Sequence, residues 1–219
     1  MLQIYETALN YWFLLGIITF LVLLKIPAPY GKFAKKNWGS WFFLMIPSQL
    51  GWIVMEIISP IMLGYFFFAG PTDKSVASYM FFLLWAGHYF NRSIIYPFRQ
   101  KNPAKMPFLI VLLAFMFNIV NGSVNGYYLG FIKTYPLEYI YEWNFILGMI
   151  LFIVGAIINV KSDNILLRLR SDKKGYHIPK GFMYKYVSYP NYLGEIIEWV
   201  AFAIMTWSLA GLSFAVWTI

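Results

Sequence analysis

The feature that most constrains this chain is the repeated return of apolar segments close to membrane-spanning length. A helix needs about 20 apolar residues to cross the hydrocarbon core of a bilayer. Hydrophobic residues make up 60% of the chain and charged residues only 12%, about half the charge of an ordinary soluble domain. The sequence therefore predicts an all-α polytopic membrane protein. We place the apolar segments at 8–26, 40–68, 76–97, 107–124, 143–168 and 194–219.

The last apolar region is interrupted at 208–211, so the sequence predicts six or seven transmembrane helices. The segment 125–141 is aromatic and bears glycine, which favours a short re-entrant or interfacial piece. We expect one integral-membrane domain over 1–219, because 219 residues leave no room for a separate soluble domain. The chain stops inside the apolar run 214–219, so we expect a polar C-terminal tail to be missing.

Basic residues are concentrated in three loops, at 25–36, 92–105 and 161–185. Of the 17 basic residues only Lys74 and Lys133 fall on the opposite side. The positive-inside rule then predicts cytoplasmic basic loops and an outside or luminal N-terminus. Both a bacterial inner membrane and the endoplasmic reticulum fit this topology. Contact with anionic lipid explains the charge, and no nucleic acid is expected because no binding motif accompanies it.

Two polar residues stand out in the apolar segments of the first half. Glu56 lies in the second segment with no base nearby in that segment. A carboxylate in hydrocarbon is costly, so it either pairs with a group from another helix or has a catalytic role. Tyr89 and Arg92 are three residues apart and can share a helix face. Tyr89 is either a packed aromatic or the donor that Glu56 orients toward a ketone oxygen.

Two polar stripes follow in the second half. The first holds Asn159, Asp163 and Arg170, and the second holds Asn191, Glu195 and Glu198. Acids and amides on a buried face indicate a cation, an amide or a ribose as ligand, and the alternative is a helix end becoming polar as it leaves the bilayer. A small-residue spacing at 122, 126 and 130 predicts helix packing, with close approach to a ligand as the alternative. No metal site is expected, since the chain has two His and no Cys.

Together these segments resemble the steroid 5α-reductase family, the 3-oxo-5α-steroid 4-dehydrogenases. The most specific stretch is 193–199, an apolar helix that opens with Gly-Glu-Ile-Ile-Glu-Trp after its first leucine. The resemblance implies a seven-span membrane enzyme that uses NADPH to reduce the Δ4 double bond of 3-oxosteroids. The other matching residues are Glu56, 88–90, Arg92, 121–122, 126–129, Asn159, 162–163, 165–166, Tyr176, 178–179, 186–188 and Asn191.

The resemblance also implies roles for individual residues. Glu56 and Tyr89 would hold the 3-keto oxygen while hydride goes to C5 and a proton to C4, and Trp52, Met55 and Glu198 would contact substrate. Many relatives carry glutamine where this chain has Met55, and relatives often carry arginine where it has His177. The cofactor would lie in a cavity open to the cytoplasm, held by Arg92, Arg99, Lys101, Lys105, Asn159, Asp163, Arg170, Tyr176, Asn191 and Glu195.

Three other functions stay open on the sequence. A reductase of the same fold would act on an enoyl-CoA or a polyprenol, and a methyltransferase of the isoprenylcysteine type shares a loosely similar C-terminal region. A small transporter would use Glu56, Glu195 and Glu198 as a proton relay. The expected partners are a small apolar substrate and membrane lipid. The oligomeric state is left open, and a monomer suffices for the chemistry.

Overall fold

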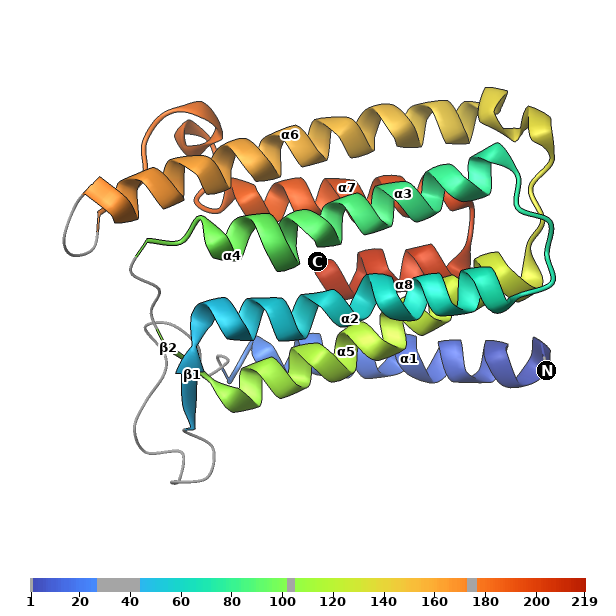
Figure 1. The fold of residues 1–219 in the computed structure, drawn as a ribbon, viewed down its shortest axis with the longest axis horizontal. Helices are drawn as coiled ribbons and strands as arrows, with labels where there is room; N and C mark the ends of the chain where they lie inside the picture. Colours follow the sequence, from blue (N-terminus) through green and yellow to red (C-terminus); the bar gives the residue numbers. More distant parts are fainter. Residues whose placement is uncertain (1, 27–43, 102–104, 173–176) are drawn as a thin grey trace. The chain divides into compact units, whose positions relative to one another are not determined.

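The computed structural model describes residues 2–26, 44–101, 105–172 and 177–219. Nearly all of its regular structure is helical, which confirms the all-α prediction (Figure 1). The helices are α1 (Leu2–Leu23), α2 (Ser48–Ala69), α3 (Val76–Phe90), α4 (Tyr96–Phe98), α5 (Phe108–Tyr127), α6 (Trp143–Asp172), α7 (Pro190–Thr206) and α8 (Leu209–Thr218). Two π-helical turns, Asn91–Ile95 and Tyr128–Ile132, continue α3 and α5, and two 3-10 turns lie at Leu137–Tyr141 and Phe182–Lys185.

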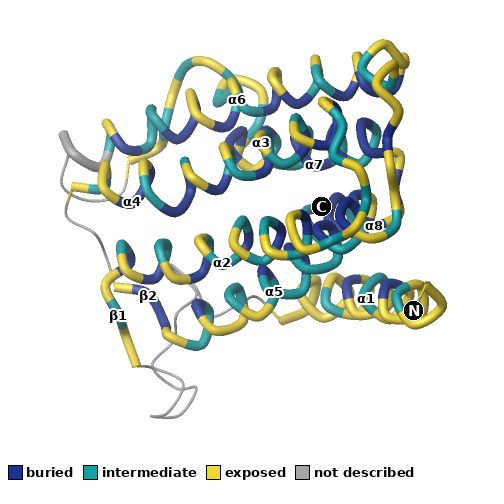
Figure 2. The backbone as a smooth tube through the Cα atoms, turned by 45° about the vertical axis from the view of Figure 1, so that its right-hand side comes forward, coloured by how far each residue is buried: buried dark blue, intermediate teal, exposed yellow. Residues whose placement is uncertain are grey.

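Four helices of the described residues are long and apolar enough to cross a membrane: α1, α2, α5 with its π turn, and α6. The segment 76–98, α7 and α8 are further helical segments, shorter or interrupted. Figure 2 shows exposed residues along the whole of α1, and many of them are large and apolar, such as Leu14, Ile17 and Leu21. Faces of this kind require lipid rather than water, so the chain is a membrane protein.

The chain divides into two compact units. The first unit comprises 1–74 and 78–134, and the second comprises 75–77 and 135–219. The expectation of a single integral-membrane domain is not decided by this division and stays a prediction.

In the first unit α2 and α5 lie side by side (Figure 1) because glycines let their backbones touch. A Cβ atom on Gly122 would lie 2.5 Å from the carbonyl oxygen of Ser59, and one on Gly126 would lie 2.6 Å from that of Leu63. Both distances exclude a side chain, so the prediction of helix packing at this spacing is confirmed. Helix α1 then packs on α5, where the ring of Tyr5 stacks on Tyr127 at 5.4 Å.

A two-stranded antiparallel sheet joins the starts of α2 and α5. Strand β1 (Met45–Pro47) pairs with β2 (Lys105–Pro107), and Ile46 stands opposite Met106. Met106 then packs with Met55 and Val111 in a buried cluster. The sequence did not predict this sheet, because the apolar run 40–68 hides the change from strand to helix.

The prediction of a re-entrant piece at 125–141 is wrong for its first half. Helix α5 and its π turn run without a break to Ile132, and only the 3-10 turn at Leu137–Tyr141 stands apart. The reason is the glycine spacing, which continues to Gly130 and keeps this segment against α2.

In the second unit α6 packs along α7, and α8 folds back beside α7. Trp199 of α7 fills the centre, with its ring 4.1 Å from that of Phe214. Helix α7 ends at Thr206, and the left-handed backbone of its C-cap Trp207 (φ 46°) reverses the chain. The Ser208 side chain then accepts from the Gly211 amide at 2.9 Å and begins α8. The break that the sequence predicts at 208–211 therefore exists.

Candidate functional site

In the first unit the carboxylate of Glu56 faces an arginine from another helical segment. Glu56 lies on α2, and Arg92 lies on the π turn that follows α3. Arg92 Nη2 is 4.0 Å from Glu56 Oε1, and the side chain of Arg92 is only 7% exposed. A buried charge needs such a counter-charge, so the partner from another helix that the sequence requires is present.

Arg92 is also enclosed by aromatic rings. Its guanidinium lies 4.4 Å from the ring centre of Trp52 and 5.3 Å from that of Tyr96. The two rings meet edge to face at 5.4 Å. Cation–π contacts of this kind offset part of the cost of removing the guanidinium from water. Arg92 thus lies beside Glu56 and Trp52, two residues expected at the substrate, while its expected role toward the cofactor phosphates stays a prediction.

Two backbone irregularities accompany this pair. Pro60 of α2 has no N–H, so the carbonyl of Glu56 lacks its usual helical donor. The π turn Asn91–Ile95 adds a residue to its helix just after Tyr89, and such turns are frequent at functional sites. No sequence pattern predicts the π turn, because its period departs from that of an α-helix for only five residues.

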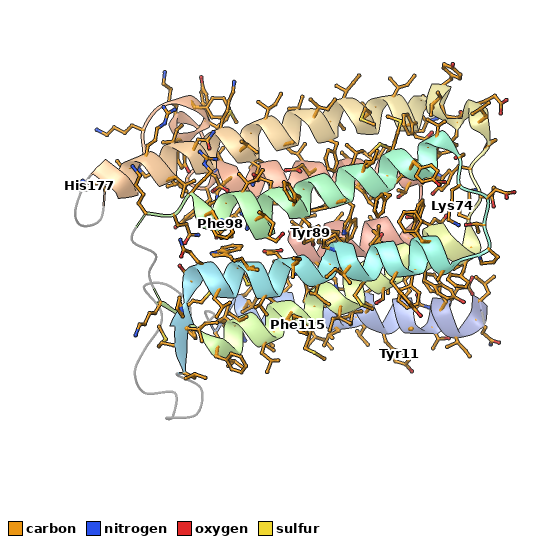
Figure 3. The ribbon with its side chains drawn as sticks, in the orientation of Figure 1. Tyr11, Lys74, Tyr89, Phe98, Phe115 and His177 are labelled. Carbon is orange, nitrogen blue, oxygen red and sulfur yellow. The ribbon has the colours of Figure 1, made fainter. Side chains whose placement is uncertain are left out.

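Tyr89 is held inside the first unit by contacts to its ring and to its hydroxyl. It is 3% exposed, and its ring stacks on Trp85 at 5.6 Å. Its hydroxyl donates to Asn118 Oδ1 at 2.9 Å, and Asn118 Nδ2 donates to the Met55 carbonyl at 2.7 Å. Figure 3 marks Tyr89 on α3. Asn118 thereby connects Tyr89 to the turn of α2 that carries Glu56.

Sequence reasoning missed Asn118, although a signal was available. Its neighbours are Phe117 and Ile119, so this amide stands inside an apolar segment. A polar side chain within a membrane helix is a functional candidate by default. Sequence reasoning also missed Trp85 and Ser59. Trp85 Nε1 donates to Ser59 Oγ at 3.2 Å, and this bond holds the ring on which Tyr89 stacks.

In the second unit the two predicted polar stripes meet. Asn159 of α6 donates to Glu195 Oε1 at 3.1 Å and to the backbone carbonyl of Asn191 at 3.1 Å. A Cβ atom on Gly194 would lie 2.5 Å from the Asn159 amide nitrogen, so glycine at 194 is what allows this approach. Asp163 and Glu198 are buried in the same unit.

Some buried polar atoms near this contact lack partners among the described residues. They include Ser162 Oγ and Asn191 Oδ1. Buried polar groups are nearly always hydrogen-bonded, so these atoms suit a bound group that offers a donor and an acceptor. A carboxamide, such as that of nicotinamide, has both. The chemistry of these two atoms is compatible with the nicotinamide of the dinucleotide that the resemblance implies.

The predicted basic residues near the phosphates lie in the first unit. Arg99, Lys101 and Lys105 are exposed at the end of α4 and on β2. Gln49 positions this segment by donating to the carbonyls of Pro97 at 3.2 Å and Gln100 at 3.3 Å. Tyr176 and the side chain of Arg170 lie outside the described residues, as do Lys32, Lys35 and Lys36 of the first basic loop.

Comparison with known proteins adds an independent finding. A family described as 3-oxo-5-alpha-steroid 4-dehydrogenase matches residues 104–219. Steroid 5-alpha-reductase DET2 of Arabidopsis thaliana is 39% identical over 206 residues, covering 90% of this chain and 77% of that protein. 3-Oxo-5-alpha-steroid 4-dehydrogenase 1 of Bos taurus is 33% identical over 210 residues, covering 93% and 80%. Its namesake from Homo sapiens is 34% identical over 178 residues, covering 80% and 69%.

Proposed function

Because this chain belongs to the 3-oxo-5-alpha-steroid 4-dehydrogenase family, we propose that it reduces the Δ4 double bond of a 3-oxosteroid with NADPH. As a family member it is an oxidoreductase acting on CH–CH groups. The observation that best supports the finer proposal is the buried arrangement around Tyr89 and Glu56. It combines a hydroxyl donor with a carboxylate that Arg92 holds at 4.0 Å.

In this mechanism the residues of the first unit act on the ketone. The Tyr89 hydroxyl donates to the 3-keto oxygen. The Glu56 carboxylate, which can only accept, orients the guanidinium of Arg92 as the positive partner of that oxygen. Negative charge develops on this oxygen as C5 is reduced, and a donor aimed at developing charge in a dry site stabilises the transition state. A proton from water then adds to C4, and the saturated ketone forms. Trp52, Met55 and Glu198 are the proposed contacts to the rest of the substrate.

The residues of the second unit bind the cofactor in this proposal. Asn159, Asp163, Asn191 and Glu195 would hold the nicotinamide end, and Ser162 Oγ and Asn191 Oδ1 would gain the partners that the described residues do not give them. Arg99, Lys101 and Lys105 would meet the phosphates. Bound NADPH supplies the hydride for C5.

The decisive experiment removes the two proposed catalytic groups one at a time. In Tyr89→Phe we expect turnover to fall about 100-fold or more, the effect of losing one donor at developing charge. In Glu56→Gln we expect a comparable fall, because the counter-charge that holds Arg92 is lost. NADPH affinity should persist, as measured by titration of the purified protein. Tyr79→Phe is the matched control, because Tyr79 lies on the same helix and is 44% exposed. Near-normal rates in both site variants would refute the assigned chemistry.

Substrate class needs its own assay. A panel of 3-oxo-Δ4-steroids is compared with enoyl-CoA and polyprenol substrates by following NADPH oxidation, and S-adenosylmethionine turnover is measured in parallel. We expect NADPH oxidation with the steroids alone. Methyl transfer, or oxidation with acyl-CoA only, would replace this proposal by one of the alternatives.

A further inference from the structure

The structure assigns the single hydroxyl proton of Tyr89 to Asn118. The Met55 carbonyl can only accept, so the NH₂ group of Asn118 must be the part of the amide that faces it, at 2.7 Å. This leaves Asn118 Oδ1 toward Tyr89, at 2.9 Å. An amide oxygen can only accept as well, so the hydroxyl has to donate. The direction of this bond therefore follows from chemistry and not from a choice of orientation.

Both partners are fixed in place. Asn118 is 4% exposed and belongs to α5, while Tyr89 is held by its ring stack on Trp85 and by its backbone. The Ser93 hydroxyl donates to the Tyr89 carbonyl at 2.7 Å. Any oxygen that comes to Tyr89 for its proton must therefore compete with an acceptor that is already in position.

We propose that Asn118 is a positioning residue. It keeps the Tyr89 hydroxyl from donating its hydrogen bond to the neutral 3-keto oxygen, and it releases the hydroxyl when that oxygen becomes charged in the transition state. This inference rests on the proposed function of Tyr89. An amide oxygen and a ketone oxygen are both neutral acceptors. Moving the hydrogen bond of Tyr89 from Asn118 to the bound ketone therefore gains little free energy. Hydrogen bonds to an ionised acceptor are roughly twice as strong. The Tyr89 hydroxyl therefore donates to the substrate oxygen once negative charge develops there.

The consequence concerns affinity and rate separately. An interaction made mainly in the transition state raises kcat, whereas one made equally with substrate lowers KM. Asn118 thus weakens ground-state binding of the 3-keto group, and the cost of breaking its bond to Tyr89 is exceeded only when the substrate oxygen becomes charged. Loss of Asn118 should tighten ketone binding, which is opposite to what damage to a buried site produces.

The test is a double-mutant cycle on the full chain in lipid nanodiscs, saturated with NADP⁺ to prevent turnover. Equilibrium binding is measured for a 3-oxo-Δ4-steroid and for the same steroid without its 3-oxygen. In Asn118→Leu, which keeps the side-chain volume, we expect the dissociation constant of the ketone to fall about 2- to 10-fold, the worth of one hydrogen bond. The deoxy steroid should bind as before. In the Tyr89→Phe background the gain should vanish, because contacting residues that act through one bond are not additive.

Two further variants keep the result interpretable. Asn125→Leu is the matched control, since Asn125 is a buried amide of the same helix that bonds to the Asn121 carbonyl at 3.0 Å. It should leave ketone affinity unchanged. Asn118→Ala also removes the acceptor, cannot overpack the site, and should reproduce the gain if the leucine variant does not fold.

Weaker ketone binding in the Asn118 variants, or a gain that persists in Tyr89→Phe, would overturn the inference. Failure of the proposed function looks different, because Tyr89→Phe would then keep its turnover. If Tyr89→Phe is inactive and the Asn118 variants bind the ketone as the wild type does, only the inference about Asn118 falls.

Discussion

At the scale of single residues, buried asparagines organise both units. Asn118 holds Tyr89 in the first unit, and Asn159 joins α6 to α7 in the second through Glu195 and the Asn191 carbonyl. An amide offers donors and an acceptor in one rigid plane, so it can orient a neighbour without adding charge. In a membrane protein this avoids the cost of a further buried ion.

Asn159→Leu tests the role of this amide in cofactor binding. We expect the NADPH dissociation constant to rise about tenfold or more, because a hydrogen bond to a charged group is lost and Glu195 loses its donor. The control is Asn144→Leu on the same helix, since Asn144 donates to Tyr139 Oη at 2.6 Å and to the Ile204 carbonyl at 3.3 Å. That variant should lower the melting temperature while NADPH affinity stays. Equal affinities in the two variants would argue against a cofactor role for Asn159.

At the scale of helices, glycine contacts decide which surfaces meet. Lipid gives no hydrophobic drive for one apolar helix to join another, so helices in a membrane associate through close packing. Gly122 and Gly126 supply this packing between α2 and α5, and Gly155 and Gly194 supply it between α6 and α7. Both contacts lie beside proposed site residues, so helix packing and site geometry are set together.

Gly126→Ala should damage the first unit. Its Cβ would lie 2.6 Å from the Leu63 carbonyl oxygen, so α2 and α5 must separate, and overpacking of this kind costs about 1–3 kcal/mol. We expect a lower melting temperature in detergent and reduced turnover. Gly87→Ala is the control, because no heavy atom lies within 4 Å of the added Cβ and alanine favours the helix. Equal melting temperatures would contradict the packing argument.

Sequence reasoning predicted the helices and the apposition of several polar residues, but not the contacts that hold them. Glu56 needed a partner from another helix, and the apposition of Asn159 with Glu195 follows from two polar stripes with matching spacing. The aromatic enclosure of Arg92 could not be predicted, since it depends on a π turn that has no periodic signature. The short sheet was hidden for a related reason, because three-residue strands inside an apolar run look like the helix that follows.

At the scale of the whole molecule, charge is expected to set orientation in the membrane. Helix α5 and its π turn separate Lys105 from Lys133 by 25 helical residues, which is about 37 Å of helix. Lys74 is expected on the sparsely charged side. Its ammonium donates to the Gly70 carbonyl at 3.1 Å and to Thr72 Oγ1 at 2.8 Å. Burial lowers the pKa of Lys74, and the neighbouring Asp73 acts in the opposite direction. Lys74 thus contacts the end of α2, whereas Arg99, Lys101 and Lys105 are exposed.

Single-cysteine labelling tests this orientation directly, because the chain has no cysteine of its own. In intact cells a membrane-impermeant maleimide should label Lys133→Cys, provided that the protein is in a plasma or inner membrane with its outer side accessible. Lys105→Cys should react only after permeabilisation. The reverse pattern would invert the proposed topology and place the basic loops outside.

The π turn after Tyr89 has a consequence for insertions and deletions. An α-helix advances about 100° per residue, and the π turn accommodates one residue more than a regular helix would. Deleting one residue between Asn91 and Ile95 would let a regular α-helix form without turning the chain beyond it, because the turn already absorbs the extra residue. The residues inside the turn would change their facing instead, and Arg92 is one of them. A change in length at this point would therefore turn Arg92 away from Trp52 while the flanking helices keep their packing.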